Sequence, residues 1–274
     1  MNRMLGKHTC PQKGNWVLFL FYGGDDLTLQ EFFVLHPRTA IAFSGGVDSS
    51  FLLYIAKKYA QEVRAYYVKS EFQPQFELND AERLAKSLGA DMKIISFSAL
   101  SAPNVKENPF NRCYYCKRAI FGAISESAEA DGFSVLLDGT NASDDAQDRP
   151  GMRALAEMSV LSPLRECGLT KSEIRRLSRE AGLFTWDKPA YACLATRIPT
   201  DEVITPEKLT ATEIAENYLF SLGFTDFRVR SQNRHAKLQL PEAQLGLLLT
   251  HRKAILAKLK ELYKSVSLDL EVRE

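Results

Sequence analysis

From residue 39 onward, short apolar runs alternate with stretches that place apolar residues at helical spacing. The apolar runs have the length and composition of buried strands, and they lie at residues 39–43, 63–68, 92–97 and 133–137. Strands that alternate with helices are typical of a parallel sheet covered by helices on both faces. We therefore predict an α/β fold with a doubly wound parallel sheet.

The pattern changes after a long stretch rich in Pro, Thr and Asp at residues 182–205, which we expect to be a long loop, of a length typical of functional or disordered segments. The C-terminal part predicts two helices and three short strands, at 206–222, 227–230, 236–240, 242–263 and 265–272. This order favours a small α+β domain. The expected organisation is an extension without an assigned role at 1–26, an α/β domain at 27–199 and an α+β domain at 200–274.

Composition excludes several classes of protein. The 274 residues carry 35 Lys and Arg against 34 Asp and Glu, so the net charge of +1 gives no global attraction to nucleic acid or to an anionic membrane. The apolar run at residues 16–22 is far shorter than the roughly 20 residues that span a bilayer. Five cysteines are odd in number and too sparse for a disulfide framework, so we expect a reducing, cytoplasmic location.

A loop of small and polar residues follows the first predicted strand and precedes a predicted helix. Its sequence, at residues 44–50, is SGGVDSS. Glycines let the backbone approach an anion, and the free N–H groups at a helix start favour negative charge, so the loop is suited to a phosphate chain. The common P-loop and dinucleotide motifs are absent. The alternative is a tight turn in which Asp48 or Ser49 caps the helix.

Three cysteines have a spacing that suggests chemistry. Cys113 and Cys116 form a CxxC motif in a loop that opens a predicted helix, a spacing suited to a metal, an iron-sulfur cluster or a redox pair. Cys193 lies in the long loop with Arg197 close by, which we expect to lower its pKa. Three thiolates can ligate a 4Fe-4S cluster and leave one iron open. The alternative for Cys193 is a small buried apolar side chain.

Other polar residues follow predicted strands. Asp138 ends the fourth strand at the carboxyl edge of the sheet, where it could act through Mg²⁺ or a ribose; a turn carboxylate before Gly139 is the alternative. Arg228 and Arg230 alternate on one strand and so share a face, where they could bind a phosphate bidentately. The alternative for this pair is a solvated sheet face.

The loop at 44–50 resembles that of the PP-loop ATP pyrophosphatases, which cleave ATP between the α and β phosphates. Further motifs narrow the resemblance to the LarE family of ATP-dependent sulfur transferases and together cover about residues 27–274. These are RCYYCK (112–117), DGTNA (138–142), RPGMRA (149–154), SPL (162–164), LTKSEI (169–174) and WDKPAYACLATRIP (186–199).

The LarE resemblance implies that the carboxylates of pyridinium-3,5-biscarboxylic acid mononucleotide are activated by AMP and converted to thiocarboxylates. The loop would bind ATP with Mg²⁺, with Asp48 in a catalytic role. The residues assigned to the ATP loop are Ser44, Gly45, Gly46, Asp48, Ser49 and Ser50. Arg228 and Arg230 resemble a phosphate-binding pair with Glu216 as companion, and Arg197 is expected beside the substrate.

The same resemblance gives Cys193 one of two roles. In one branch of the family the matching cysteine gives up its own sulfur; in the branch with three cysteines, a 4Fe-4S cluster carries an extra sulfide. Cys113 and Cys116 favour the second branch. An unidentified sulfur donor and a homo-oligomer are then expected, without nucleic acid or membrane. Two other functions are open: a tRNA thiolase with a three-cysteine cluster, and an ATP-binding module without catalysis.

Overall fold

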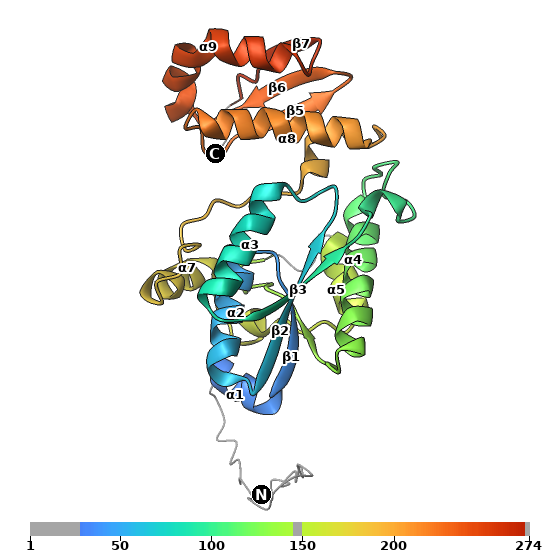
Figure 1. Ribbon diagram of the computed structural model, residues 1–274, viewed down its shortest axis with the longest axis vertical. Helices are drawn as coiled ribbons and strands as arrows, with labels where there is room; N and C mark the ends of the chain where they lie inside the picture. The colour runs from blue at the N-terminus through green and yellow to red at the C-terminus, as the bar shows by residue number, and fades with distance from the viewer. Residues whose placement is uncertain (1–27, 145–149, 272–274) are drawn as a thin grey trace, which may run out of the picture.

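The computed structural model describes residues 28–144 and 150–271, so the extension expected at 1–26 lies outside the described part. Two layered units follow one another along the chain, each with its own buried core (Figure 1). The first contains a parallel sheet between helices, and the second is a smaller unit with its own sheet. No helix within the described ranges is long and apolar enough to cross a bilayer.

The first unit is built on a four-stranded sheet in which every pairing is parallel. Its strands are β1 (Arg38–Ala42), β2 (Glu62–Lys69), β3 (Asp91–Ser96) and β4 (Leu136–Leu137), in the order β3-β2-β1-β4. The order reverses between β1 and β4, and ligands of such sheets bind where the order reverses, at the carboxyl ends of the strands. The predicted doubly wound sheet is confirmed, although β4 is shorter than the predicted run at 133–137.

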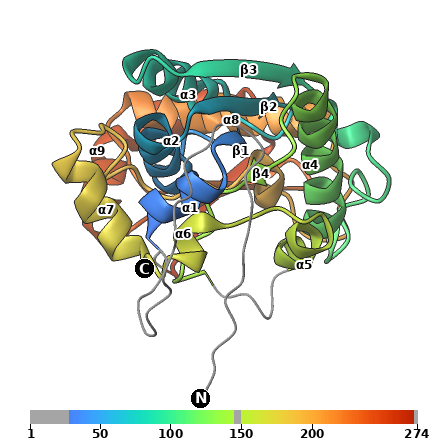
Figure 2. The same ribbon diagram turned by 90° about the horizontal axis from the view of Figure 1, so that it is seen from below.

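Helices cover both faces of this sheet (Figure 2). One face carries α1 (Leu29–Leu35), α2 (Val47–Tyr59), α3 (Gln75–Ser87), α6 (Pro163–Glu166) and α7 (Lys171–Glu180), which share one apolar core. The other face carries α4 (Arg112–Ala130), with α5 (Pro150–Glu157) packed against it. Helical spacing predicts helices at 49–59, 78–88 and 170–181, which agree with α2, α3 and α7 within three residues. The helix predicted to follow a loop at 113–116 and to run to about 128 begins earlier, at Arg112, as α4. Helices α1, α5 and α6 have no predicted counterpart.

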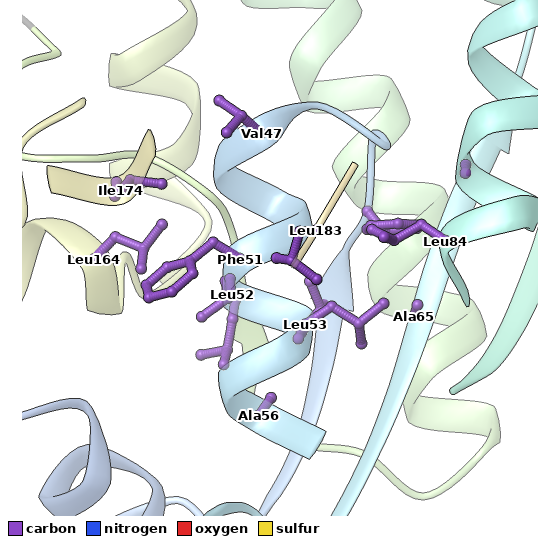
Figure 3. Packing of buried hydrophobic residues seen from close by; sticks show 14 of the residues in the cluster. Val47, Phe51, Leu52, Leu53, Ala56, Ala65, Leu84, Leu164, Ile174 and Leu183 are labelled. Carbon is purple, nitrogen blue, oxygen red and sulfur yellow. The ribbon is translucent and has the colours of Figure 1, made fainter. Parts of the chain in front are cut away.

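Helix α2 occupies the centre of the larger core. Phe51, Leu52 and Ala56 are buried as the helical spacing predicts, and Ile55 is half-buried against the same cluster. Figure 3 shows Leu164 and Ile174 beside Phe51. Burial of about 25 cal/mol per Å² of apolar surface makes these contacts a main stabilising term for the sheet-helix layer.

A capping box starts α7, as the spacing of Thr170 and Glu173 in the sequence predicts. The Thr170 hydroxyl accepts from the Glu173 N–H, and the Glu173 carboxylate accepts from the Thr170 N–H at 2.9 Å. Two N–H groups that the helix leaves without partners are thereby satisfied. The cap fixes the first turn of α7, including Lys171.

The second unit contains a three-stranded sheet and two long helices. Its elements are α8 (Pro206–Ser221), β5 (Arg228–Gln232), β6 (His235–Gln239), α9 (Leu245–Lys260) and β7 (Ser265–Leu268). Strand β5 runs antiparallel to β6, whereas β7 runs parallel to it. Asn233 and Arg234 form the hairpin turn with φ of 48° and 61°. These elements agree with the predicted α+β order.

Candidate active site

The SGGVDSS loop makes the turn between β1 and α2. Gly45 has φ of +71°, and a Cβ there would lie 3.1 Å from Ala81 Cβ, so both its conformation and its surroundings require glycine. The cap residue of α2 is Gly46, and no side chain caps the helix. The alternative turn, with Asp48 or Ser49 as cap, is therefore not the one formed.

Hydroxyl groups hold the loop in shape. The Ser44 and Ser49 hydroxyls lie 3.0 Å apart, and the Gly46 N–H donates to Ser44 Oγ at 3.3 Å. The Ser44 N–H also donates to Ser49 Oγ. Because these contacts join residues at most five apart, the loop is shaped mainly by its own sequence.

Asp48 forms an ion pair that sequence reasoning did not assign. Its Oδ2 lies 2.5 Å from Lys171 Nζ in the first turn of α7. Its Oδ1 is buried and has no hydrogen-bond partner within the described chain. Burial raises the pKa of Asp48, while the Lys171 ammonium opposes that rise. An incompletely satisfied carboxylate beside a phosphate-type loop is suited to bind a cation.

A second lysine contacts the same loop. Lys188 Nζ donates to the Gly45 carbonyl at 3.4 Å and lies 3.2 Å from Glu77 and 2.8 Å from Asp80. Burial raises the pKa of Glu77, and Lys188 opposes this. Lys171 and Lys188 both stand in the motifs that carry the LarE resemblance, so the sequence contained the signal although it assigned them no role.

Asp138 is satisfied by its own turn. Its carboxylate accepts from the Thr140 N–H and hydroxyl at 3.2 and 2.5 Å, and from the Ser162 hydroxyl at 2.7 Å. At the next residue, a Cβ on Gly139 would lie 2.9 Å from Ser49 N, so this turn packs directly on the start of α2. The geometry favours the turn carboxylate over a direct contact to Mg²⁺ or ribose.

The predicted cysteines come from two segments. Cys113 and Cys116 lie in the first two turns of α4 rather than in a loop, and Cys113 is exposed. Cys116 and Cys193 are half-buried and pack against the same apolar cluster, which contains Phe72 and Leu194. Residues far apart in sequence thus meet at this cluster.

The thiols of Cys116 and Cys193 are shifted toward the protonated form. Burial, together with the nearby Cys193, raises the pKa of Cys116 to about 12. Burial also raises the pKa of Cys193, and Arg112 and Arg197 only oppose it. The prediction that Arg197 gives Cys193 a lowered pKa is therefore wrong, because loss of hydration outweighs the nearby positive charge.

The described side chains form no site for a single metal ion. Across residues 28–144 and 150–271, no three His, Cys, Asp or Glu side chains could hold a metal ion together. A 4Fe-4S cluster differs from a single ion, because each thiolate binds a different iron atom. Cys113 and Cys193 lie near enough to Cys116 to raise its pKa, and Cys113 likewise raises the pKa of Cys193.

A pocket joins the loop to the cysteine segment at the carboxyl ends of β1 and β2. Its volume is about 230 Å³, and its lining includes Ser44, Glu77, Tyr191 and Cys193. The Ser44 end belongs to the SGGVDSS loop, and the Cys193 end belongs to the segment before α8. One pocket therefore brings two of the predicted site residues together.

Arg197 and Glu216 form a fully buried pair. Arg197 Nε lies 2.8 Å from Glu216 Oε1, and the two side chains are 0% and 1% exposed. Glu216 also accepts from the Tyr191 hydroxyl and, at 2.9 Å, from the Val229 N–H. Both predicted substrate residues thus serve, in this structure, to join the Cys193 segment to α8 and β5.

The predicted arginine pair is not a solvated face. Arg228 is 7% exposed and donates to the Phe227 and Ala190 carbonyls. Arg230 is half-buried and donates to Gln239 Oε1 at 2.7 Å and to the Thr196 carbonyl. The solvated-face alternative is therefore wrong, and both guanidinium groups lie against the Cys193 segment.

Comparisons with known proteins agree with this architecture. The asparagine synthase family model matches residues 37–142, which contain the loop. An uncharacterized protein of Synechocystis is 38% identical over 219 residues, covering 79% of this chain and 81% of that relative. The tRNA-specific 2-thiouridylase MnmA of Thermotoga neapolitana is 28% identical, with 53% and 52% of the two chains covered.

A further relative matches along both units. The pyridinium-3,5-bisthiocarboxylic acid mononucleotide synthase of Lactiplantibacillus plantarum is 34% identical over 236 residues, which cover 85% of this chain and 86% of that protein. Identity at this level over nearly the whole length, with the ATP-type loop and the parallel sheet in place, is decisive for the family. The chain belongs to the LarE family of ATP-dependent sulfurtransferases.

Proposed function

We propose that this enzyme converts the two carboxylates of pyridinium-3,5-biscarboxylic acid mononucleotide to thiocarboxylates, with AMP and pyrophosphate as the other products. The observation that carries the proposal is the single pocket lined by Ser44 of the loop and by Cys193. An activated carboxylate and a sulfur source can meet in such a pocket. The name of the Lactiplantibacillus relative supports the choice of substrate.

The SGGVDSS loop would carry out the first step, in which ATP activates the substrate carboxylate. Its N–H groups would bind the pyrophosphate portion of ATP, and Lys171 and Lys188 lie where their charge would stabilise it. Asp48 Oδ1, buried without a described partner, fits a ligand to the Mg²⁺ that accompanies ATP. A substrate carboxylate oxygen then bonds to the α-phosphorus, and pyrophosphate leaves.

The three cysteines would serve the second step, in which sulfur is transferred to the activated carboxylate. A sulfur nucleophile bonds to the acyl carbon, and AMP leaves with the former carboxylate oxygen. Cys113, Cys116 and Cys193 would hold a 4Fe-4S cluster, which supplies a bound sulfide. The raised pKa values of Cys116 and Cys193 mean that binding of the cluster must displace thiol protons there, as is usual for thiolate ligands.

Substrate would be oriented by the C-terminal unit. Arg228 and Arg230 on β5 would bind the phosphate, while Arg197 and Glu216 hold β5 beside the Cys193 segment. This arrangement divides the chain into an ATP-binding domain at 27–199 and a substrate domain at 200–274. The match to the synthase over 86% of its length, against 52% of the thiouridylase, supports a mononucleotide over tRNA.

The proposal is tested by the products of one reaction mixture. Anaerobically purified enzyme is given ATP, Mg²⁺ and the pyridinium biscarboxylate, and products are identified by mass spectrometry. We expect AMP and pyrophosphate in proportion to thiocarboxylate. Orthophosphate with ADP, or AMP without any sulfur in the pyridinium product, would contradict the proposed reaction.

The route of sulfur is tested on the protein itself. If a cluster is held, purified enzyme absorbs broadly near about 400 nm, and each of the three Cys→Ala variants loses this absorption. If Cys193 instead gives up its sulfur, the spent chain is lighter by roughly one H₂S, about 34 Da. Cys113→Ala would then keep one turnover.

A further inference from the structure

Two arginines hold the main chain on either side of Cys193. Arg228 NH2 donates to the Ala190 carbonyl at 3.0 Å, and Arg230 NH1 donates to the Thr196 carbonyl at 2.5 Å. These carbonyls stand three residues before and three residues after the cysteine. The arginines predicted to bind substrate phosphate are therefore already engaged with the segment that carries the sulfur chemistry.

A substrate phosphate would compete with the carbonyls of residues 190–196 for the N–H groups of Arg228 and Arg230. Arg228 is buried, with its guanidinium 5.6 Å from the centre of the Tyr191 ring. Bidentate binding of a phosphate uses two N–H groups of one guanidinium in a fixed geometry. Since a charged oxygen is a stronger acceptor than a neutral carbonyl, a phosphate displaces the Ala190 and Thr196 carbonyls.

We propose that Arg228 and Arg230 form a latch on residues 190–196 that substrate phosphate opens. When the mononucleotide binds, its phosphate takes the arginine N–H groups and the two carbonyls pass to water. The Cys193 segment, which lines the same pocket as Ser44, is then free to move within it. The latch rests on the proposed function only in taking the substrate to be a phosphomonoester.

Other contacts keep the movement local. Arg197 NH1 donates to the Ala192 carbonyl at 2.9 Å, and its pairing with the buried Glu216 leaves no access for phosphate. The Leu194 N–H donates to the Phe72 carbonyl at 2.9 Å. The segment can therefore shift at its two ends without leaving the fold.

The latch is tested by hydrogen-deuterium exchange of the full-length protein, purified anaerobically. The probe is nicotinic acid mononucleotide, a pyridinium carboxylate with the required phosphate, and its riboside is the control without phosphate. We expect the mononucleotide to speed exchange severalfold in peptides covering 189–197, and the riboside to have no effect. Slower or unchanged exchange with the mononucleotide would overturn the latch.

Variants provide a second arm that needs no ligand. Arg228→Gln and Arg230→Gln should each raise exchange in the same peptides without any ligand, and the mononucleotide should then add little. Lys237→Gln is the matched control, because Lys237 lies opposite Arg230 in the β5–β6 register and pairs with Asp269 instead of the loop. Peptides of β1 report whether the fold is retained. Unchanged exchange in both arginine variants would contradict the latch.

The latch and the proposed function can fail separately. AMP and thiocarboxylate production with no exchange response to the mononucleotide would refute the latch and leave the function standing. Faster exchange with the mononucleotide, but no AMP from the reaction mixture, would refute the function and leave the phosphate-opened latch standing.

Discussion

The two ends of the pocket are built in different ways. The ATP end is a contiguous loop whose internal hydrogen bonds join residues at most five apart. The proposed sulfur end, at Cys193, belongs to a segment that the C-terminal unit holds from outside the pocket, through contacts such as Arg230 with Thr196 and Arg228 with Ala190. One end is specified locally, whereas the other depends on tertiary structure.

The two ends also differ in how far they are already arranged to bind a ligand. The ATP end has its glycine conformations and hydroxyl contacts in place, with two lysines alongside. At the sulfur end, the arginines are bonded to main-chain carbonyls and burial raises the pKa of Cys116 and Cys193. Preorganisation therefore favours ATP binding, and ligand-driven change is expected at the other end.

The buried ion pair gives the largest expected effect. Glu216→Gln keeps the shape of the side chain but leaves the Arg197 charge uncompensated, which costs about 3 to 5 kcal/mol when a buried pair is broken. The free energy of unfolding from urea titration measures this. Glu180→Gln, in an exposed pair with 61% and 59% exposure, should cost about 0.5 kcal/mol or less. Similar losses in both variants would mean that the sulfur end does not depend on this tertiary contact.

The ATP loop comes next. Ser49→Ala or Asp48→Ala should lower pyrophosphate formation by roughly 100-fold or more, because a preorganised contact to the phosphates or to Mg²⁺ is lost. Urea unfolding should change little, since almost no apolar surface is removed. Ser221→Ala, which loses only a hydrogen bond to the Tyr218 carbonyl, is the control. Full pyrophosphate formation in both loop variants would break the assignment of the ATP end.

Variants of Arg228 and Arg230 should affect ligand binding at one end of the pocket and not at the other. Arg228→Ala or Arg230→Ala should weaken mononucleotide binding by about 1.5 to 3 kcal/mol, through loss of a charge-assisted hydrogen bond. Calorimetry should show ATP affinity almost unchanged. An equal fall in both affinities would show that the pair supports the fold or the ATP site instead.

The smallest effect is a pH shift at the ATP end. Burial raises the pKa of Asp48 and Lys171 opposes the rise, so Lys171→Met should raise that pKa further. Ionised Asp48 is present above its pKa and is lost as pH falls through it. The acid limb of pyrophosphate formation should therefore move upward by about one pH unit in Lys171→Met. Lys171→Arg should keep the limb in place, and an unshifted limb in both variants would contradict a role for ionised Asp48.

The parts of the fold that could be predicted are those specified by residues close together in the sequence. Apolar periodicity gave β1 to β3 and the long helices, and the Thr170 to Glu173 capping box marked α7. Helix α1 also begins with a capping box, at Thr28, but its short length gives little periodic pattern. The run at 133–137 yields only a two-residue strand, because Phe133 packs with α4 instead of extending the ladder.

The site was predictable only in part, because only some of its residues belong to a local sequence motif. The loop is a contiguous motif, so its residues could be named in advance. The Lys171 contact to Asp48 joins residues 123 apart, and spacing in sequence gives no sign of it. The pKa of Cys193 was misjudged because burial is a tertiary property that outweighs the nearby arginines.

The most direct test of the central claim, that one pocket joins ATP chemistry to sulfur delivery, is the Cys193→Ser variant. AMP, pyrophosphate and thiocarboxylate are measured together after incubation with ATP and the pyridinium biscarboxylate. The variant keeps the ATP loop intact, so it should still release pyrophosphate as it adenylates the carboxylate, while AMP, which leaves only when sulfur attacks, and thiocarboxylate are not formed. Thiocarboxylate formation at the wild-type rate in Cys193→Ser would contradict the claim.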